Sequence, residues 1–192
     1  MNYIFNNVME WFFLINTNPS YSKSIQGLRD PIVSNTINLY KMIQEKFRPT
    51  PAKSHYTYNL RDVSKVFQGI AKASPKAITN DNEMIKLWAH ECLRVFSDRL
   101  ISESDHEKFS ELLKEQIKEK FKRDWTSLVE VEPLLFASFV PLCYPDGDTS
   151  KKPYNDVYCE LTDRVKVKQS AENFLGEYNN MFPSKKMNLV LF

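Results

Sequence analysis

A broad apolar stripe between residues 84 and 100 constrains the fold of this chain more than any other pattern in it. Its members recur at spacings of three and four, which places them on one side of an α-helix; they are Met84, Leu87, Trp88, Cys92, Val95, Phe96 and Leu100. Asn80 or Asp81 can cap the start of that helix, and Glu83 lies in its first turn. Burying the stripe would contribute on the order of 10 kcal/mol before the entropy of folding is counted. Other elements must cover a face of this width.

Other segments repeat the helical spacing, and they are separated by prolines and polar residues. We expect helices over residues 3–15, 20–47, 60–73, 104–121 and 161–180. Pro31 predicts a kink or a division into two pieces in the second of them, and Ser104 with Glu107 has capping-box spacing in the fourth. The inward-facing residues expected in the last helix are Leu161, Val165, Leu175 and Tyr178. The predicted core of the bundle comprises Val66, Phe67, Leu87, Trp88, Val95, Phe96, Leu112 and Leu113.

The pattern changes after Trp125. The run from Leu134 to Val140 is short, apolar and bounded by prolines, which is more typical of a strand than of a helix. Residues 144–153 form a polar, turn-rich stretch, and residues 156–160 would also suit an extended conformation. The predicted fold class is therefore mostly α, a helical bundle that could carry a short β-ribbon near residues 134–160.

Composition argues against several classes of protein. The net charge of +2 and the 26% of charged residues are ordinary for a globular chain and lack the basic excess of a nucleic-acid surface. Lys118 to Arg123 is a basic cluster, but Glu119 interrupts it and favours a solvated helix face. Polar residues interrupt the apolar N-terminal stretch, which predicts neither a signal peptide nor a membrane span. Three cysteines without a paired spacing argue against a disulfide framework and a zinc site, and favour a reducing compartment.

Motifs for catalysis and metal binding are incomplete. The chain has only four glycines, no GxxxxGK[ST] phosphate loop, and no apolar strand ending in paired acids that would hold magnesium. His90-Glu91 begins the HExxH zinc signature, but Arg94 takes the place of the second histidine, so a polar helix edge is favoured. Residues 146–148 (Asp-Gly-Asp) lack the bidentate glutamate of a calcium loop. We expect no catalytic residue and no metal ligand.

The run from Pro49 to Gly69 is the most informative stretch for function. Its prolines exclude helix at the start, and the apolar spacing from Val63 to Ile70 then predicts one. Asn59 is the expected N-cap, and Asp62 is a first-turn carboxylate that the helix dipole favours. Arg61 is thereby held at a helix N-terminus, where an anion such as a phosphate can bind. Judged by its position alone, an arginine in the first turn of a helix is more often a solvated or salt-bridged surface residue.

Three stretches, in the same order, resemble dynein heavy chains. PTPAKSHYTYNLRDVSKVFQG, at residues 49–69, resembles the start of the lid subdomain in the third AAA+ module, and is more like axonemal than cytoplasmic members. WAHECLRVFSDRL, at residues 88–100, matches next, and residues 187–192 resemble the entry into the fourth module. The resemblance implies three parts: residues 1–48 as a helical segment following the large subdomain, residues 49–183 as the lid bundle, and residues 184–192 as the connection toward the next module.

The resemblance also implies a role in a microtubule motor. In this family ATP with magnesium lies between a large subdomain and its lid, and a lid arginine called sensor II reaches the γ-phosphate; Arg61 matches that position. Nucleotide state would then be relayed round the ring of modules. The phosphate loop would belong to neighbouring parts of the heavy chain, so the fragment alone would be inactive and would bind no cofactor tightly.

The implied partners are the neighbouring AAA+ subdomains of the same heavy chain and, through the whole motor, the microtubule. The implied location is the cytoplasm and cytoskeleton, in the axoneme of a cilium or flagellum, with no nucleic acid and no membrane as partner. Tyr56 and Tyr58 would have both rings on one side of an extended stretch. They would pack against the lid core, which we favour, or lie against the large subdomain near the nucleotide.

A protein of a different class remains an alternative, namely a free-standing helical adaptor that binds a protein partner through its apolar faces. An excised lid should expose apolar surface where the large subdomain and the next module would dock. The apolar tail from Met187 to Phe192 has no terminating signal, which favours excision.

Overall fold

The computed structural model describes residues 1–15, 20–138 and 157–190. It contains two compact units, Met1–Leu134 and Leu135–Phe192. The expected divisions at residues 48/49 and 183/184 concern the limits of the parts implied by the resemblance and stay predictions. Among the described helices, none has both the length and the apolar character needed to cross a bilayer.

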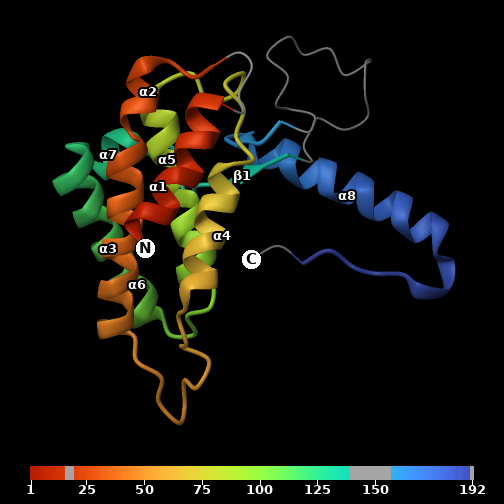
Figure 1. Ribbon diagram of the computed structural model, residues 1–192. Coiled ribbons are helices and arrows are strands. Elements are labelled where there is room, and N and C mark those ends of the chain that lie inside the picture. The colour runs from red at the N-terminus through yellow and green to blue at the C-terminus, as the bar shows by residue number, and fades with distance from the viewer. Residues whose placement is uncertain (16–19, 139–156, 191–192) are drawn as a thin grey trace. The chain divides into compact units, whose positions relative to one another are not determined.

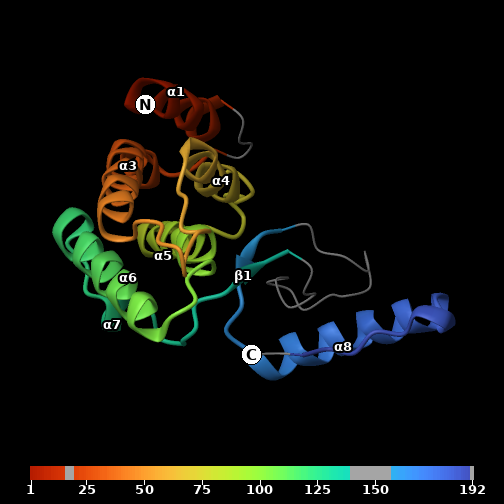
Figure 2. The same ribbon diagram turned by 90° about the horizontal axis from the view of Figure 1, so that it is seen from below.

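The first unit is a bundle of α-helices. They are α1 (Asn2–Glu10), α2 (Lys23–Gly27), α3 (Arg29–Lys46), α4 (Leu60–Ile70), α5 (Asp81–Cys92), α6 (Glu103–Gln116) and α7 (Trp125–Leu128). π-Helical segments extend α1, α5 and α6: η1 (Trp11–Ile15), η2 (Leu93–Ser97) and η3 (Ile117–Phe121). In Figures 1 and 2, α1 lies across α3 and α4, and α5 lies on their other side. The predicted mostly α fold is confirmed.

Reciprocal capping fixes the starts of α4 and α5. The Asn59 side chain accepts a hydrogen bond from Arg61 N at 2.9 Å, and Asp62 accepts one from Asn59 N at 3.0 Å. Asn80 and Glu83 form the same box at 2.9 and 3.3 Å. These bonds satisfy backbone N–H groups that have no helical partner in the first turn. Both starts confirm the predicted caps.

Two other helix starts involve Pro31 and Ser104. The predicted second helix is in two pieces, which divide at Leu28, and Pro31 falls in the first turn of α3, where its missing N–H leaves no bond unmade. The Ser104 capping box is wrong, because α6 has Ser102 as its N-cap and begins at Glu103. Asp105 then lies in the first turn, where it binds Lys53 instead of facing solvent.

The predicted core is confirmed around Trp88. All eight predicted core residues are buried, and none is more than 5% exposed. Trp88 donates a hydrogen bond from Nε1 to Thr36 Oγ1 at 2.8 Å, and its ring meets that of Phe121 edge-on at 5.2 Å. The stripe between residues 84 and 100 therefore joins α5 to both α3 and the end of α6.

Helix α4 packs against α5 through Gly69. A Cβ at this position would lie only 1.9 Å from Glu91 Oε2. Glu91 is fully buried, and its carboxylate accepts hydrogen bonds from Arg94 Nε at 2.9 Å and Nη2 at 2.6 Å. The missing side chain at Gly69 thus leaves the space that a buried carboxylate occupies.

The second unit begins with a short antiparallel ribbon. Strand β1 (Phe136–Ala137) pairs with β2 (Cys159–Glu160), and Leu161 N donates to Leu135 O at 2.8 Å beyond the strands. This confirms the short β-ribbon near residues 134–160. Residues 139–140 of the expected strand, the turn-rich stretch and the Asp-Gly-Asp sequence lie outside the described residues.

Helix α8 (Arg164–Met181) and the 3₁₀ turn η5 (Pro183–Lys185) complete this unit. The Asn179 side chain exchanges two hydrogen bonds with the backbone of Met187, at 2.9 and 2.8 Å, so the tail returns along the helix. The predicted helix is confirmed, but Val165 was expected to face inward and is 66% exposed. The described part of this unit has no second α-helix that could bury it.

The cysteines differ from expectation. Cys159 is disulfide-bonded, whereas Cys92 is free and buried in α5. Spacing along the chain misses such a bond because a disulfide requires only that two thiols meet in the fold.

Candidate site at the start of helix α4

Arg61 lies in the first turn of α4 with its side chain exposed. Its backbone N–H is engaged by Asn59, but its guanidinium makes no hydrogen bond or ion pair with any residue in the described ranges. The N-terminal turn supplies a partial positive charge in the same place. The result is a cationic group on a fixed backbone, free to receive an anion.

Asp62, the next residue, is buried. It accepts hydrogen bonds from Asn59 N at 3.0 Å and Arg99 Nη2 at 2.8 Å, and Lys65 Nζ lies 3.4 Å away. Burial by itself raises the pKa of this carboxyl, but the bonds from Arg99 and Asn59 outweigh it and lower the pKa. Asp62 is thus held as a carboxylate at the base of the turn that carries Arg61.

Arg99 lies in the turn that follows η2, and it connects the start of α4 to that end of η2. Besides its bond to Asp62, its Nη1 donates to Thr57 O at 2.8 Å, and its guanidinium carbon lies 4.8 Å from the centre of the Tyr58 ring. Its backbone carbonyl accepts a hydrogen bond from His55 Nε2 at 3.1 Å. One side chain therefore contacts both the loop before α4 and the first turn of α4.

The loop before α4 is anchored along its length. Lys53 Nζ donates to Ser102 Oγ at 3.0 Å and also binds Asp105, to which Tyr56 Oη donates at 2.9 Å. The hydrogen bond from Lys53 is the main cause that lowers the pKa of Asp105 to about 2. Tyr58 Oη donates to Phe96 O at 3.2 Å, a bond made inside the bundle.

Both tyrosines are buried, which confirms that they pack within the bundle. The alternative, that they lie against the large subdomain near the nucleotide, is not favoured, because their rings and hydroxyls have partners within this unit. Their role is to hold the loop.

His90 and Glu91, the half zinc signature, are both buried instead of forming a polar helix edge. His90 Nδ1 donates to Leu134 O at 3.1 Å, and burial lowers the pKa of the imidazole. Among the described residues no group of three potential ligands could hold a metal ion. This pair serves packing between α5 and its neighbours.

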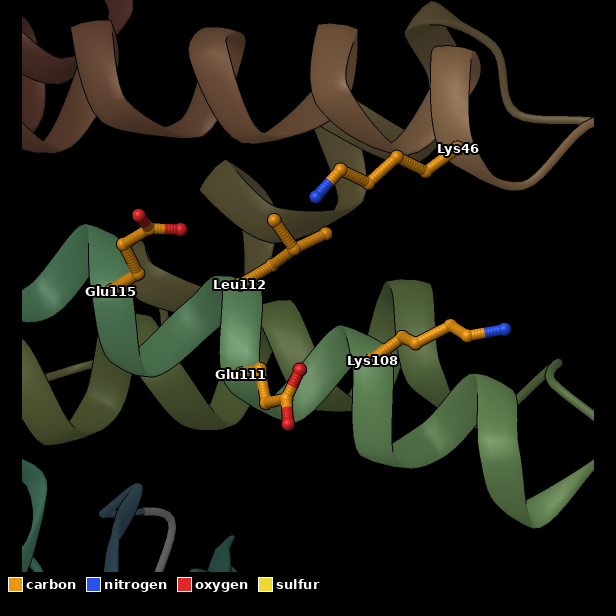
Figure 3. Close-up of a pocket in the computed structure, with 5 residues that line it drawn as sticks. All are labelled: Lys46, Lys108, Glu111, Leu112 and Glu115. Carbon is orange, nitrogen blue, oxygen red and sulfur yellow. The ribbon is translucent and has the colours of Figure 1, made fainter.

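A hollow of about 290 Å³ lies between the end of α3 and α6 (Figure 3). Lys46 reaches from α3 toward Leu112, while Lys108 and Glu111 point away from it. Mixed charges that do not converge on a common point give this hollow no catalytic arrangement.

Sequence reasoning identified Arg61 but missed the residues that hold its turn. Arg99, Lys53 and Asp105 are separated from their partners by 37 to 52 positions along the chain, so no local pattern reveals the contacts. The available signal was the family resemblance, because Lys53 lies in its first stretch and Arg99 in its second.

Comparisons with known proteins cover the whole site. Residues 13–106 match the family described as dynein heavy chain, ATPase lid domain. Relatives include dynein axonemal heavy chain 1 of Mus musculus, 37% identical over 98% of this chain, and the same protein of Homo sapiens, 34% identical over 98%. Dynein axonemal heavy chain 10 of Homo sapiens is 35% identical over 90%. The chain spans 4% of the length of each of these relatives.

Proposed function

Because this chain belongs to the dynein heavy chain family, with the ATPase lid domain at residues 13–106, we propose that it is the lid of the third AAA+ module and that Arg61 contacts the γ-phosphate of ATP. The choice of the third module rests on the amino-acid sequence of residues 49–69. ATP with magnesium would lie between this lid and the large subdomain of the same heavy chain, and the chain alone would not hydrolyse it.

The observation that carries the proposal is the availability of the Arg61 guanidinium. Arg99 and Lys65 are both paired with Asp62, the residue next to Arg61, whereas Arg61 has no partner in the described ranges. A planar guanidinium can bind two phosphate oxygens at once through charge-assisted hydrogen bonds. Loss of the γ-phosphate would remove these bonds and release the lid from its large subdomain.

The proposed consequence is a mechanical relay. Release of the lid would pass the nucleotide state of one module to its neighbours in the ring, and so to microtubule binding by the whole motor. The named relatives are axonemal dyneins, which supports a place for the parent protein in the cytoskeleton of a cilium or flagellum.

The test uses a heavy-chain segment that contains the complete module. Arg61→Ala should weaken ATP binding relative to ADP by about tenfold or more, since it removes charge-assisted bonds worth roughly 1.5–3 kcal/mol. Arg61→Lys should restore only part of the preference, because an ammonium cannot reproduce the planar fork. Calorimetric titration with each nucleotide gives both affinities.

Arg48→Ala is the matched control, because Arg48 is also an exposed arginine without a partner among the described residues, but it lies outside the first turn of a helix. It should leave both affinities unchanged. Arg61→Ala should also leave the stability of the chain within about 0.5 kcal/mol, as for other surface sites. An unchanged ATP preference in Arg61→Ala would refute the γ-phosphate role.

A second candidate function, protein–protein interaction, is favoured by the outer face of the first helix. Large apolar residues there are exposed: Tyr3 by 77%, Ile4 by 63%, Val8 by 47% and Trp11 by 50%. In a lid this face would be covered by neighbouring subdomains, and in an adaptor by a separate protein. An adaptor makes no use of Arg61, so the same titration separates the two candidates.

A further inference from the structure

We infer that Arg99 is a positioning residue for Arg61, because it ties the first turn of α4 to the end of η2 and so makes the two move together. The ligand of Arg61 follows from the proposed function. The link between Arg99 and the first turn of α4 follows from the contacts within this chain. When the end of η2 shifts, Arg99 would cause the first turn of α4, and with it Arg61, to shift by the same amount.

The tie consists of contacts on both sides of the start of α4. On the loop side, Arg99 Nη1 binds Thr57 O at 2.8 Å, and the guanidinium covers the Tyr58 ring. On the helix side, Nη2 binds Asp62 Oδ1 at 2.8 Å and Nη1 lies 3.3 Å from Asp62 Oδ2. A rigid planar fork is suited to such bridging.

The tie reaches Arg61 through the capping box. Asp62 Oδ2, which Arg99 approaches, also accepts the hydrogen bond from Asn59 N, and the Asn59 side chain accepts the one from Arg61 N. The Asp62 carboxylate therefore holds the backbone of Asn59, whose side chain in turn holds the Arg61 N–H. Without Arg99 this buried carboxylate would lose the cation that another element supplies to it.

Lys65 offers a matched comparison. It too is paired with Asp62, at 3.4 Å, but it lies three residues further along α4 and its side chain is 47% exposed. Because Lys65 and Asp62 both belong to α4, their contact does not join α4 to another element. Lys65→Gln therefore removes the same charge beside Asp62 as Arg99→Gln does, and leaves the tie intact.

The first test measures amide hydrogen exchange in the 192-residue chain. Arg99→Gln should speed exchange of the Arg61 N–H by roughly tenfold or more, because opening of the first turn becomes local. Val66, in the middle of α4, should change far less, and Lys65→Gln should change neither. Arg99→Lys should lie between the chain itself and Arg99→Gln, and it supplies the result if Arg99→Gln does not fold.

A merely structural Arg99 would give a different result. It would speed exchange at Arg61 and Val66 by the same factor, in step with the loss of global stability, and this would overturn the inference. So would an unchanged exchange rate at Arg61 in both Arg99 variants.

The second test uses the heavy-chain segment and its preference for ATP over ADP. Arg99→Lys should reduce this preference in the direction of Arg61→Ala, and the two changes together should have little more effect than Arg61→Ala alone. If Arg61→Ala reduces the preference and Arg99→Lys does not, the positioning role is wrong and the proposed function stands. If local exchange changes but neither variant alters the preference, the tie is supported and the γ-phosphate role is wrong.

Discussion

Replacing Gly69 by alanine provides the sharpest test of how α4 and α5 are packed. Helix propensity alone predicts that the substitution stabilises the chain by about 1 kcal/mol, since glycine is unfavourable inside a helix. The structure predicts the opposite sign, because the new Cβ would lie 1.9 Å from Glu91 Oε2 and 2.0 Å from its Cδ. One of the two must move.

The magnitude follows from what holds Glu91. Its side chain is flexible in principle, but it is fully buried and bound to Arg94 at 2.6 and 2.9 Å. The Arg94 side chain is 43% exposed, so displacing Glu91 should cost about 2–4 kcal/mol, somewhat less than breaking a fully buried ion pair. After subtraction of the gain in propensity, Gly69→Ala should lower the free energy of unfolding by about 1–3 kcal/mol.

Urea denaturation followed by circular dichroism and tryptophan fluorescence measures this change. The control is Gly27→Ala, because Gly27 lies at the end of α2 in the same unit and has no atom within 4 Å of an added Cβ. Gly27→Ala should be neutral or slightly stabilising. A Gly69→Ala variant that behaves like Gly27→Ala would refute the packing argument.

Further predictions concern the core and the dependence of stability on pH. Trp88→Ala should lower the free energy of unfolding by about 3–5 kcal/mol, because the ring is fully buried; a loss below about 1 kcal/mol by urea denaturation would contradict its central place. Because the bond from Lys53 lowers the pKa of Asp105 to about 2, Asp105 stabilises the folded chain above its unfolded pKa of about 3.9 and ceases to do so as the pH falls toward 2. The stability difference between the chain and Asp105→Asn should shrink over that range, and a constant difference would show that Asp105 does not titrate with folding. Burial lowers the pKa of His90, so the stability it provides is complete above about pH 6.5 and is lost on acidification; His90→Gln should flatten the decline between pH 7 and 5 measured by thermal unfolding, and an unaltered slope would mean that other groups cause it.

Features decided by neighbouring residues could be predicted from the sequence. The caps of α4 and α5 are reciprocal bonds within four residues, and the stripe containing Trp88 has the period of one helix face. Arg61 was placed in the first turn on the same grounds. Its exposure follows because the apolar residues of α4 occupy the opposite face.

Features decided by distant residues could not be predicted. From the sequence, Gly69 only lowers the stability of a helix. The structure shows that its missing side chain makes room for Glu91. The start of α6 was misplaced by the local spacing of Ser104 and Glu107, and the contact of Asp105 with Lys53, 52 residues earlier in the chain, could not be seen from that spacing. Val165 was expected to face inward because of its apolar spacing, but the described part of its unit has no second α-helix to cover it.

The anchored loop between Lys53 and Tyr58 has a thermodynamic consequence. Ordering the backbone of such a segment costs about 1–2 kcal/mol per residue, or about 6–12 kcal/mol for these residues together. Their contacts with residues 96–105 meet this cost when the chain folds. An anion that binds Arg61 would therefore restrict little more than the rotamers of one side chain, about 2 kcal/mol. Because the loop is already ordered when the chain folds, the contacts between Arg61 and the anion are opposed by little further loss of conformational entropy.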